Sequence, residues 1–266
     1  MEKKRFFTVL SLVAAFVLTA AVAVGGLLDN DPFLNESGAP VWARDLETLV
    51  YRVSFFGIPA GYAEFQYVGE EKEGERRLYH IRLRAWTTGL VKFFKEIHDV
   101  FDFYIDAESL LPHKVVERKR ESGKVKEKVS VYDQEKGVIT YYSLDGKKIG
   151  ERKVVPHVFE SVSVAYFLRT KDLLFDAPEV IVYGGKKLFK LRIQVEGKER
   201  VKTEAGVFDT IKIKPDMERI DGGTSKKYDV TAWTLDDGSG IPVLVHASLK
   251  VGTLTGELVS FIRGDK

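Results

Sequence analysis

Apolar and polar side chains alternate in short runs from Leu46 to the end of the chain, and turn residues separate the runs. A period of two is typical of β-strands that bury one face. Asp145-Gly146 and Ser122-Gly123 each join two runs, and such dipeptides favour tight hairpins between antiparallel strands. We therefore predict strands in sequence order over residues 48–56, 62–68, 78–85, 97–105, 114–121, 124–132, 137–143, 147–155, 180–183, 187–195, 199–203, 208–214, 228–235, 242–249 and 254–262.

Two segments break this alternation and predict helices. In residues 88–96 the apolar side chains have the spacing of a short amphipathic helix or a wide turn. In residues 161–169 they share one helical stripe, and Ser161 is placed to cap the first turn. We expect a mainly β fold, in which a strongly curved antiparallel meander sheet approaches a half-barrel and one or two short helices pack against it. A two-sheet β-sandwich is the alternative.

The predicted hairpin over residues 114–132 carries charges that alternate in sign along both strands. Opposite charges can pair across such a ladder, and lysines on strand edges resist aggregation. We interpret this hairpin as a solvated face of the sheet.

The N-terminus has the pattern of an export segment. Residues 6–28 are uncharged and strongly apolar, and three basic residues precede them at positions 3–5. We predict a signal peptide or an N-terminal membrane anchor over residues 1–28. The length of the apolar run favours an anchor that spans the bilayer, whereas the small residues at 21–23 favour cleavage.

The remaining boundaries follow from this leader. Residues 29–45 contain proline, glycine and polar side chains and are expected to form a flexible linker, and residues 46–266 form the exported domain. Because the basic residues stay in the cytoplasm, we expect the domain in the periplasm or cell envelope, with contact to the inner membrane through residues 6–28 if they are retained. No cysteine follows the apolar run, which excludes a lipoprotein anchor.

Composition excludes several classes of function. The chain has no cysteine, so it has no disulfide, thiolate metal site or cysteine nucleophile. Its 41 basic and 39 acidic residues nearly cancel, and this balance argues against a nucleic-acid partner. Only two Asn and three Gln stand beside many Lys, Glu and Arg, a bias that favours a thermophilic source.

No catalytic constellation is recognisable in the sequence. The five histidines lack the close spacing of a zinc motif, and the best group, His98 with Asp99 and Asp102, is more simply interpreted as structural. Asp236 and Asp237 are adjacent, so on a strand they point to opposite faces, and a turn role is favoured. Neither a Gly-x-Ser-x-Gly elbow nor a phosphate-binding loop occurs. We predict no enzymatic activity, no cofactor and no metal.

Six short motifs occur in a fixed order over residues 46–262. They are Gly57-Ile58-Pro59-Ala60-Gly61, Leu110-Leu111-Pro112, Ala165-Tyr166-Phe167-Leu168-Arg169, Thr203-Glu204-Ala205-Gly206-Val207-Phe208, Ala232-Trp233-Thr234-Leu235-Asp236-Asp237 and Ile241-Pro242-Val243. Together they resemble the bacterial family catalogued as domain of unknown function (DUF) 3108. The resemblance implies an exported protein, but no activity, cofactor or catalytic residue that could be carried over.

Aromatic side chains supply the remaining candidate site. A dense apolar cluster lies beside the bend at residues 88–96, where an open curved sheet would have its mouth. Ordinary core packing is the competing interpretation. The candidate ligand-binding residues are Trp86, Leu90, Phe93, Phe94, Tyr166 and Phe167.

Three functional hypotheses follow. The first is a non-catalytic periplasmic carrier that shelters an apolar or amphipathic molecule, such as a lipid or an envelope polymer, in a groove of the curved sheet. The second is an assembly or structural factor that docks an envelope protein through a strand edge or the charged hairpin near Arg118. The third, ranked last, is a glycan hydrolase that uses Asp99, Asp102 or Glu160.

Overall fold

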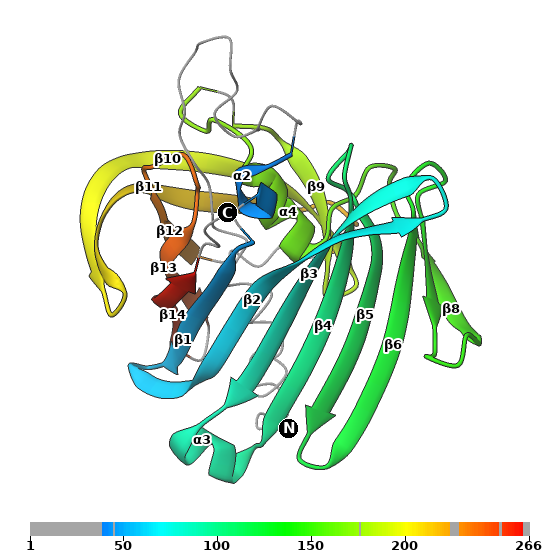
Figure 1. Ribbon diagram of the computed structural model, residues 1–266, viewed down its shortest axis with the longest axis horizontal. Helices are drawn as coiled ribbons and strands as arrows, with labels where there is room; N and C mark the ends of the chain where they lie inside the picture. Colours follow the sequence, from blue (N-terminus) through cyan, green and yellow to red (C-terminus); the bar gives the residue numbers. More distant parts are fainter. Residues whose placement is uncertain (1–38, 45, 176, 224–228, 250–251, 263–266) are drawn as a thin grey trace.

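The computed structural model describes residues 39–44, 46–175, 177–223, 229–249 and 252–262, which fold around one continuous curved sheet (Figure 1). The predicted leader, residues 1–28, lies outside the described residues. The strands are β1 Thr48–Phe55, β2 Ile58–Glu73, β3 Arg76–Thr87, β4 Ile97–Asp106, β5 Pro112–Glu121, β6 Lys124–Asp133, β7 Val138–Tyr142, β8 Lys148–Lys153, β9 Val180–Gly184, β10 Lys187–Thr203, β11 Gly206–Arg219, β12 Asp229–Leu235, β13 Pro242–Leu249 and β14 Gly252–Ile262.

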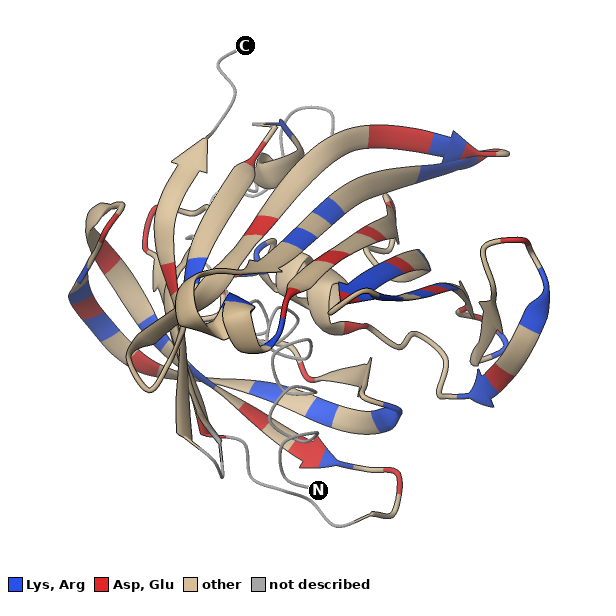
Figure 2. Cartoon of the chain, turned by 90° about the horizontal axis from the view of Figure 1, so that it is seen from below, with Lys and Arg blue, Asp and Glu red and all other residues tan. Residues whose placement is uncertain are grey.

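These strands form a 14-stranded sheet in the order β8-β7-β6-β5-β4-β3-β2-β1-β14-β13-β12-β11-β10-β9. Consecutive strands pair antiparallel except β8 and β9, and the first strand pairs with the last, with Thr48 opposite Ile262. The predicted antiparallel meander is confirmed, and the β-sandwich alternative is not observed. Basic and acidic residues are interleaved along the strands (Figure 2), as expected for a chain of nearly neutral balance.

The sheet is not closed, because its two edge strands, β8 and β9, do not pair with each other. The chain between them contains the main helix. Three contacts connect this part of the chain to the strands at the two edges. Phe159 forms a parallel bridge with Val182 on β9, and the hydroxyl groups of Tyr141 on β7 and Tyr183 on β9 lie 2.8 Å apart. The Gln134 side-chain amide, after β6, donates to the Val158 carbonyl before the helix at 3.0 Å. The break in the barrel therefore falls where the helix is inserted.

One predicted pair of strands is a single strand. Residues 187–195 and 199–203 both belong to β10, which pairs with β11 along its whole length. The alternation fails between them because the register shifts between Val195 and Gly197. Such a bulge inserts an extra residue and moves the following side chains to the other face.

The helices are α2 Val41–Arg44, α3 Gly89–Phe94 and α4 Ser161–Leu168. The N-cap of α4 is Glu160, not Ser161: its carboxylate accepts hydrogen bonds from the Val162 and Ser163 amides, and the Ser163 hydroxyl accepts from the Glu160 amide at 3.1 Å. In the described part of the chain, none of the helices has both the length and the apolar character needed to cross a bilayer.

The packed domain begins before residue 46, which is the boundary that we predicted from the sequence. Trp42, on α2, lies in the segment that we expected to be a flexible linker, yet only 1% of its surface is exposed. Its indole ring packs edge-on against the rings of Tyr67, Tyr79 and Tyr166. One aromatic side chain therefore fastens the end of the predicted linker to the sheet and to α4.

The sheet has two unlike ends. Helices α2 and α4 cover one of them, which we call the closed end, and α3 lies at the other, which we call the rim (Figure 1). At the closed end, the buried Arg169 guanidinium donates to both carboxylate oxygens of Glu47 at 2.7 and 2.6 Å and to the Ser239 carbonyl at 3.0 Å. This clamp ties the end of α4 to the start of β1 and to the turn before β13.

Candidate functional site

Charged side chains lie on the inner, concave face of the sheet. Leu83, Phe101, Glu117 and Lys128 are successive register partners across β3, β4, β5 and β6, so they share one face. Leu83 and Phe101 belong to the hydrophobic core, which identifies that face as the inner one. Lys119 shares it, because it lies two residues from Glu117 on the same strand. We call Asp99, Glu117, Lys119 and Lys128 the inner charged strip.

Glu117 holds the two lysines of the strip in place. Its carboxylate lies 3.2 Å from the Lys119 ammonium and 2.5 Å from that of Lys128. Burial by itself raises the pKa of Glu117, but the two lysines outweigh burial and lower it. The ammonium groups also lie over aromatic faces, Lys119 at 5.1 Å from the Phe101 ring centre and Lys128 at 5.0 Å from that of Tyr141.

The inner face changes character along β5 and β6. Toward the closed end its side chains, Val115, Ser130 and Tyr132, are buried. Toward the rim, the Lys119 and Lys128 side chains keep 27% and 36% of their surface exposed. Because these lysines point inward, that exposure means that the concave face is open to solvent in its rim half. The arrangement places apolar rings and fixed positive charge side by side at a solvent-accessible inner surface.

Asp99 completes the strip and is the most strongly perturbed group in it. Its side chain is buried opposite Ala85 and Lys119, and its carboxylate accepts a hydrogen bond from the Arg120 amide at 3.0 Å. Burial raises the pKa of Asp99 to about 6. The Asp99 carboxyl therefore changes from protonated to ionised near pH 6, beside the lysines of the strip.

Asp102 lies on the outer face and is enclosed by basic groups. Its carboxylate lies 2.8 Å from His80 Nε2 and accepts hydrogen bonds at 2.7 Å from both Arg82 and Arg118. Burial alone would raise the pKa of Asp102, but these partners lower it to about 2. Asp99 and Asp102 thus face opposite sides of the sheet and cannot act on one bond, and the described residues contain no group of three or more potential metal ligands.

The structure does not bring the six candidate ligand-binding residues together. Trp86 is half-buried on the outer face, where its ring stacks on Tyr62 at 5.7 Å. The three apolar candidates on α3 project into solvent at the rim; they are Leu90, Phe93 and Phe94. The two on α4 lie at the closed end, where Tyr166 is buried and Phe167 packs against Phe159 at 4.7 Å between ring centres.

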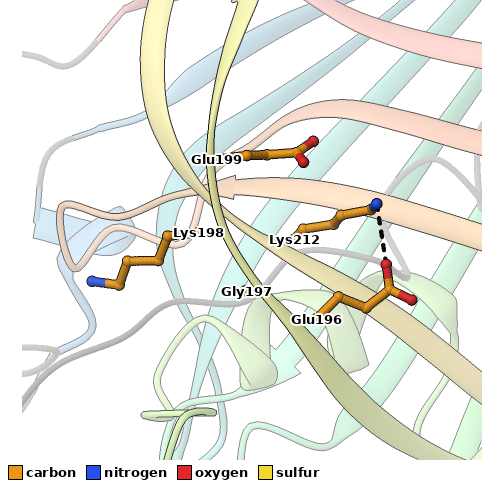
Figure 3. Close-up of a pocket in the computed structure, with 5 residues that line it drawn as sticks. All are labelled: Glu196, Gly197, Lys198, Glu199 and Lys212. Atoms are coloured by element: carbon orange, nitrogen blue, oxygen red, sulfur yellow. Dashed lines mark ion pairs between the residues drawn. The ribbon is translucent and has the colours of Figure 1, made fainter.

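A separate pocket of about 370 Å³ lies at the bulge in β10 (Figure 3). Its lining is polar and its charges balance, since it contains two lysines and two glutamates. Lys212 and Lys214 already bind the Glu196 carboxylate at 3.1 and 2.9 Å. None of the residues that line the pocket is aromatic, so the inner charged strip remains the better candidate site. The lining residues are Glu196, Gly197, Lys198, Glu199 and Lys212.

Sequence reasoning missed the strip because it interpreted the hairpin at 114–132 as a solvated face. One signal was present. Val115, Glu117 and Lys119 share a face by alternation, and Val115 is apolar where a fully solvated face would be polar. The cross-strand partners that identify this face as the inner one come only from the register.

Comparison with known proteins gives a family and a fold. The family model described as "Protein of unknown function (DUF3108)" matches residues 50–259, which confirms the resemblance in the motifs. A β-barrel-like protein of domain of unknown function DUF1849 from Brucella abortus superposes with a TM-score of 0.58 at 9% identity, over 83% of this chain and 98% of that one. This likeness supports the fold alone. None of the curated proteins compared with the chain matches it.

Two other solved structures share less of the geometry. One, from Parabacteroides distasonis, is provisionally described as a lipoprotein and has a TM-score of 0.36 at 11% identity, over 82% of this chain and 96% of that chain. The other, from Bacteroides fragilis, is provisionally described as an exported protein with a YmcC-like fold and has a TM-score of 0.32 at 9% identity, over 82% and 96%.

Proposed function

The chain belongs to the DUF3108 family, and from its sequence and geometry we propose that it is a non-catalytic protein of the cell envelope that binds an anionic amphipathic molecule on the concave face of its sheet. The observation that carries this proposal is the inner charged strip, in which Lys119 and Lys128 lie over aromatic rings on a face open to solvent. A fatty acid or an acidic lipid has the matching chemistry.

The two parts of such a ligand have separate partners. The acyl part lies on the accessible part of the inner face, against the half-buried Tyr141 ring and the stems of the two lysines, because Leu83 and Phe101 are already buried in the core. The anionic group lies beside Lys119 and Lys128, in an environment less polar than water, where a charged hydrogen bond is strong. Glu117 positions both lysines; the strip carries one excess positive charge while Asp99 is protonated and is neutral once Asp99 is ionised.

Three observations favour a binding role over catalysis. Asp99 and Asp102 lie on opposite faces, and the Asp102 carboxylate is taken up by basic partners. Glu160, the third carboxylate of the hydrolase hypothesis, is buried and caps α4 through its hydrogen bonds to the Val162 and Ser163 amides. These carboxylates have no shared position at which a scissile bond could be bound between them.

The envelope location rests on the sequence of the leader. An uncharged run over residues 6–28 behind three basic residues directs export, and the domain then lies on the far side of the inner membrane. The alternative function is an assembly factor that docks a protein partner through a strand edge or the charged hairpin near Arg118. The hairpin route has less support, because Arg118 already donates to Asp102 at 2.7 Å.

Binding of cis-parinaric acid, a fluorescent fatty acid, to the purified full chain tests the proposal. Lys119→Gln and Lys128→Gln should each weaken binding about ten-fold, because each removes one charged hydrogen bond. Arg120→Gln is the matched control: it makes the same change of charge on the neighbouring position of β5, but on the outer face. Thermal unfolding of each variant checks that the fold is retained.

Two results would overturn the proposal. One is the absence of saturable binding by the unaltered chain, together with the absence of co-purified lipid in solvent extracts examined by mass spectrometry. The other is an equal effect of the inner variants and Arg120→Gln, since the concave face would then have no special role.

A further inference from the structure

Large apolar side chains gather at the rim and point into solvent. Phe93 is 88% exposed, and each of the others in the group is more than half exposed. We call this group the rim patch. Its members are Phe56, Ile58, Leu90, Phe93, Phe94 and Val125.

Hydrogen bonds join the three segments of the rim patch into one surface. The Thr88 amide at the start of α3 donates to the Ala60 carbonyl on β2 at 3.0 Å, next to the β1–β2 turn. The Ser122 amide in the β5–β6 turn donates to the Glu96 carbonyl after α3 at 2.8 Å. Helix α3 therefore lies between the two turns, and all three loops belong to the same end of the sheet.

The apolar side chains of α3 contribute nothing to the core, because α3 has no buried residue. The helix is six residues long, and Leu90, Phe93 and Phe94 make up half of it. A group of exposed large apolar side chains on adjoining loops of a folded domain marks an interaction site. The hydrophobic core would be complete with polar residues at these positions.

The surroundings of the rim patch indicate what covers it. The same loops carry four lysines, Lys92, Lys95, Lys124 and Lys126, against two glutamates, Glu96 and Glu121. Lys92 forms a half-exposed ion pair with Glu96 at 3.4 Å, and Lys95 pairs with Glu121 at 3.0 Å. The segments from 56 to 58, from 88 to 96 and from 121 to 126 therefore have a net charge of 4 − 2 = +2. Apolar tips ringed by lysine suit an anionic membrane surface, in which the tips enter the acyl region and the ammonium groups stay with the lipid phosphates.

An aromatic pair stands directly behind the patch. Tyr62 and Trp86 stack on the outer face of β2 and β3, and Trp86 lies three positions before the first residue of α3. Tyr and Trp concentrate at the headgroup level of membrane proteins, because their rings are apolar at one end and polar at the other. The order along the molecule, from apolar tips to an aromatic pair to charged strands, follows the profile of a bilayer surface.

We propose that the rim patch docks the domain on an anionic lipid bilayer, with Phe93 and Phe94 inserted and Lys92 and Lys124 against the headgroups. This inference does not depend on a ligand at the inner charged strip. It gives four of the predicted site residues, Trp86, Leu90, Phe93 and Phe94, a shared role on an exterior surface.

The absence of cysteine allows a local test in the full chain, whatever its leader does. Leu90→Cys labelled with the environment-sensitive dye NBD reports on the rim, and Glu75→Cys reports on the exposed turn at the other end of β2 and β3. With vesicles of phosphatidylethanolamine and phosphatidylglycerol, the label at position 90 should shift to the blue and resist aqueous iodide. The label at position 75 should stay quenchable.

Two sets of variants test the chemistry in the same assay. Replacing both Phe93 and Phe94 by Ser should weaken the partitioning of the rim label about 100-fold, or about ten-fold for each ring lost from the bilayer. The double variant Lys92→Gln with Lys124→Gln should weaken partitioning about five-fold for each charge removed. Replacing the anionic vesicles by phosphatidylcholine vesicles should weaken partitioning of the unaltered rim to a similar extent. Far-ultraviolet circular dichroism confirms that each variant is folded.

Several outcomes would overturn the proposal. If both labels stay exposed while the chain floats with the vesicles, the leader alone binds the membrane. If the label at position 90 shifts without vesicles as protein concentration rises, the rim patch contacts a second copy of the chain. If vesicles protect both labels equally, the attachment has no preferred end. Failure of fatty-acid binding at the inner strip would leave a positive result here intact.

Discussion

The buried pair of Arg169 and Glu47 makes a direct test of how the closed end is held together. Both side chains are almost fully buried, and the guanidinium donates two hydrogen bonds to the carboxylate and a third to the Ser239 carbonyl. Burial by itself lowers the pKa of Arg169, but the Glu47 carboxylate outweighs it and the net shift is upward. Arg169 therefore remains charged, and Arg169→Met removes the whole cation.

The magnitude follows from what the change leaves behind. In Arg169→Met, the Glu47 carboxylate stays buried without its cation, and breaking such a pair costs about 3–5 kcal/mol. The free energy of unfolding of an ordinary domain is about 5–15 kcal/mol, so this loss is a large part of the total stability. The double variant Glu47→Leu with Arg169→Met should lose much less, because it leaves no buried charge.

Urea unfolding at pH 7, followed by tryptophan fluorescence, measures the stability lost in Arg169→Met and in the double variant. Trp42 packs on Tyr166, over which the Arg169 guanidinium lies at 5.1 Å, so its emission reports on the closed end. The midpoint should fall without a change of slope. A loss below about 1 kcal/mol for Arg169→Met, or a double variant as unstable as the sum of the single variants, would refute the view that this buried pair clamps α4 to the sheet.

Three further predictions concern single positions. Since burial raises the pKa of Asp99 to about 6, stability should fall as pH rises from about 4 to 6, and Asp99→Asn should flatten that decline and gain up to about 3 kcal/mol at pH 7 in urea unfolding. The pKa of Asp102 is lowered to about 2, because its basic partners outweigh burial, so its stabilisation is present above about pH 4 and lost toward pH 2. Asp102→Asn should therefore cost about 2 kcal/mol at pH 7 and little near pH 2. A β-carbon at Gly61 would lie 2.1 Å from the Trp86 carbonyl oxygen, so Gly61→Ala should cost more than about 2 kcal/mol, whereas Gly184→Ala, which meets no atom within 4 Å, should leave the melting temperature nearly unchanged.

Alternation and turn residues were enough to predict the meander, because each strand buries one face and ends at a turn. β13 was predicted with its observed bounds, Pro242–Leu249, and the turns at Ser122-Gly123 and Asp145-Gly146 lie where expected. The β1–β2 turn is shorter than predicted, because Pro59 is inside β2 rather than in the turn. Proline is tolerated there because β3 ends opposite Gly61 and leaves no ladder partner for residue 59 on that side.

The site depended on information that a strand sequence lacks. Glu117 and Lys119 are charged, as are Arg118 and Arg120 on the other face of β5, and Val115 and Val116 place an apolar residue on each face, so local pattern could not show which face is inner. Register with Phe101 and Asp99 on β4 decides it. Trp42 was missed for a related reason: a single tryptophan in a segment with proline and glycine gives no periodic signal, and only its tertiary contacts with three tyrosines reveal that it is buried.

The two proposed surfaces occupy the same end of the molecule, and that placement has a physical consequence. The closed end is covered by α2 and α4 and fastened by the Arg169–Glu47 pair, so the solvent-accessible part of the concave face is its rim half. A bilayer against the rim patch would therefore adjoin the opening that leads to Lys119 and Lys128. In these two proposals together, an acidic lipid passes between bilayer and sheet without crossing bulk water, so rim variants such as Phe93→Ser should slow loading from vesicles while leaving the affinity for dissolved fatty acid unchanged.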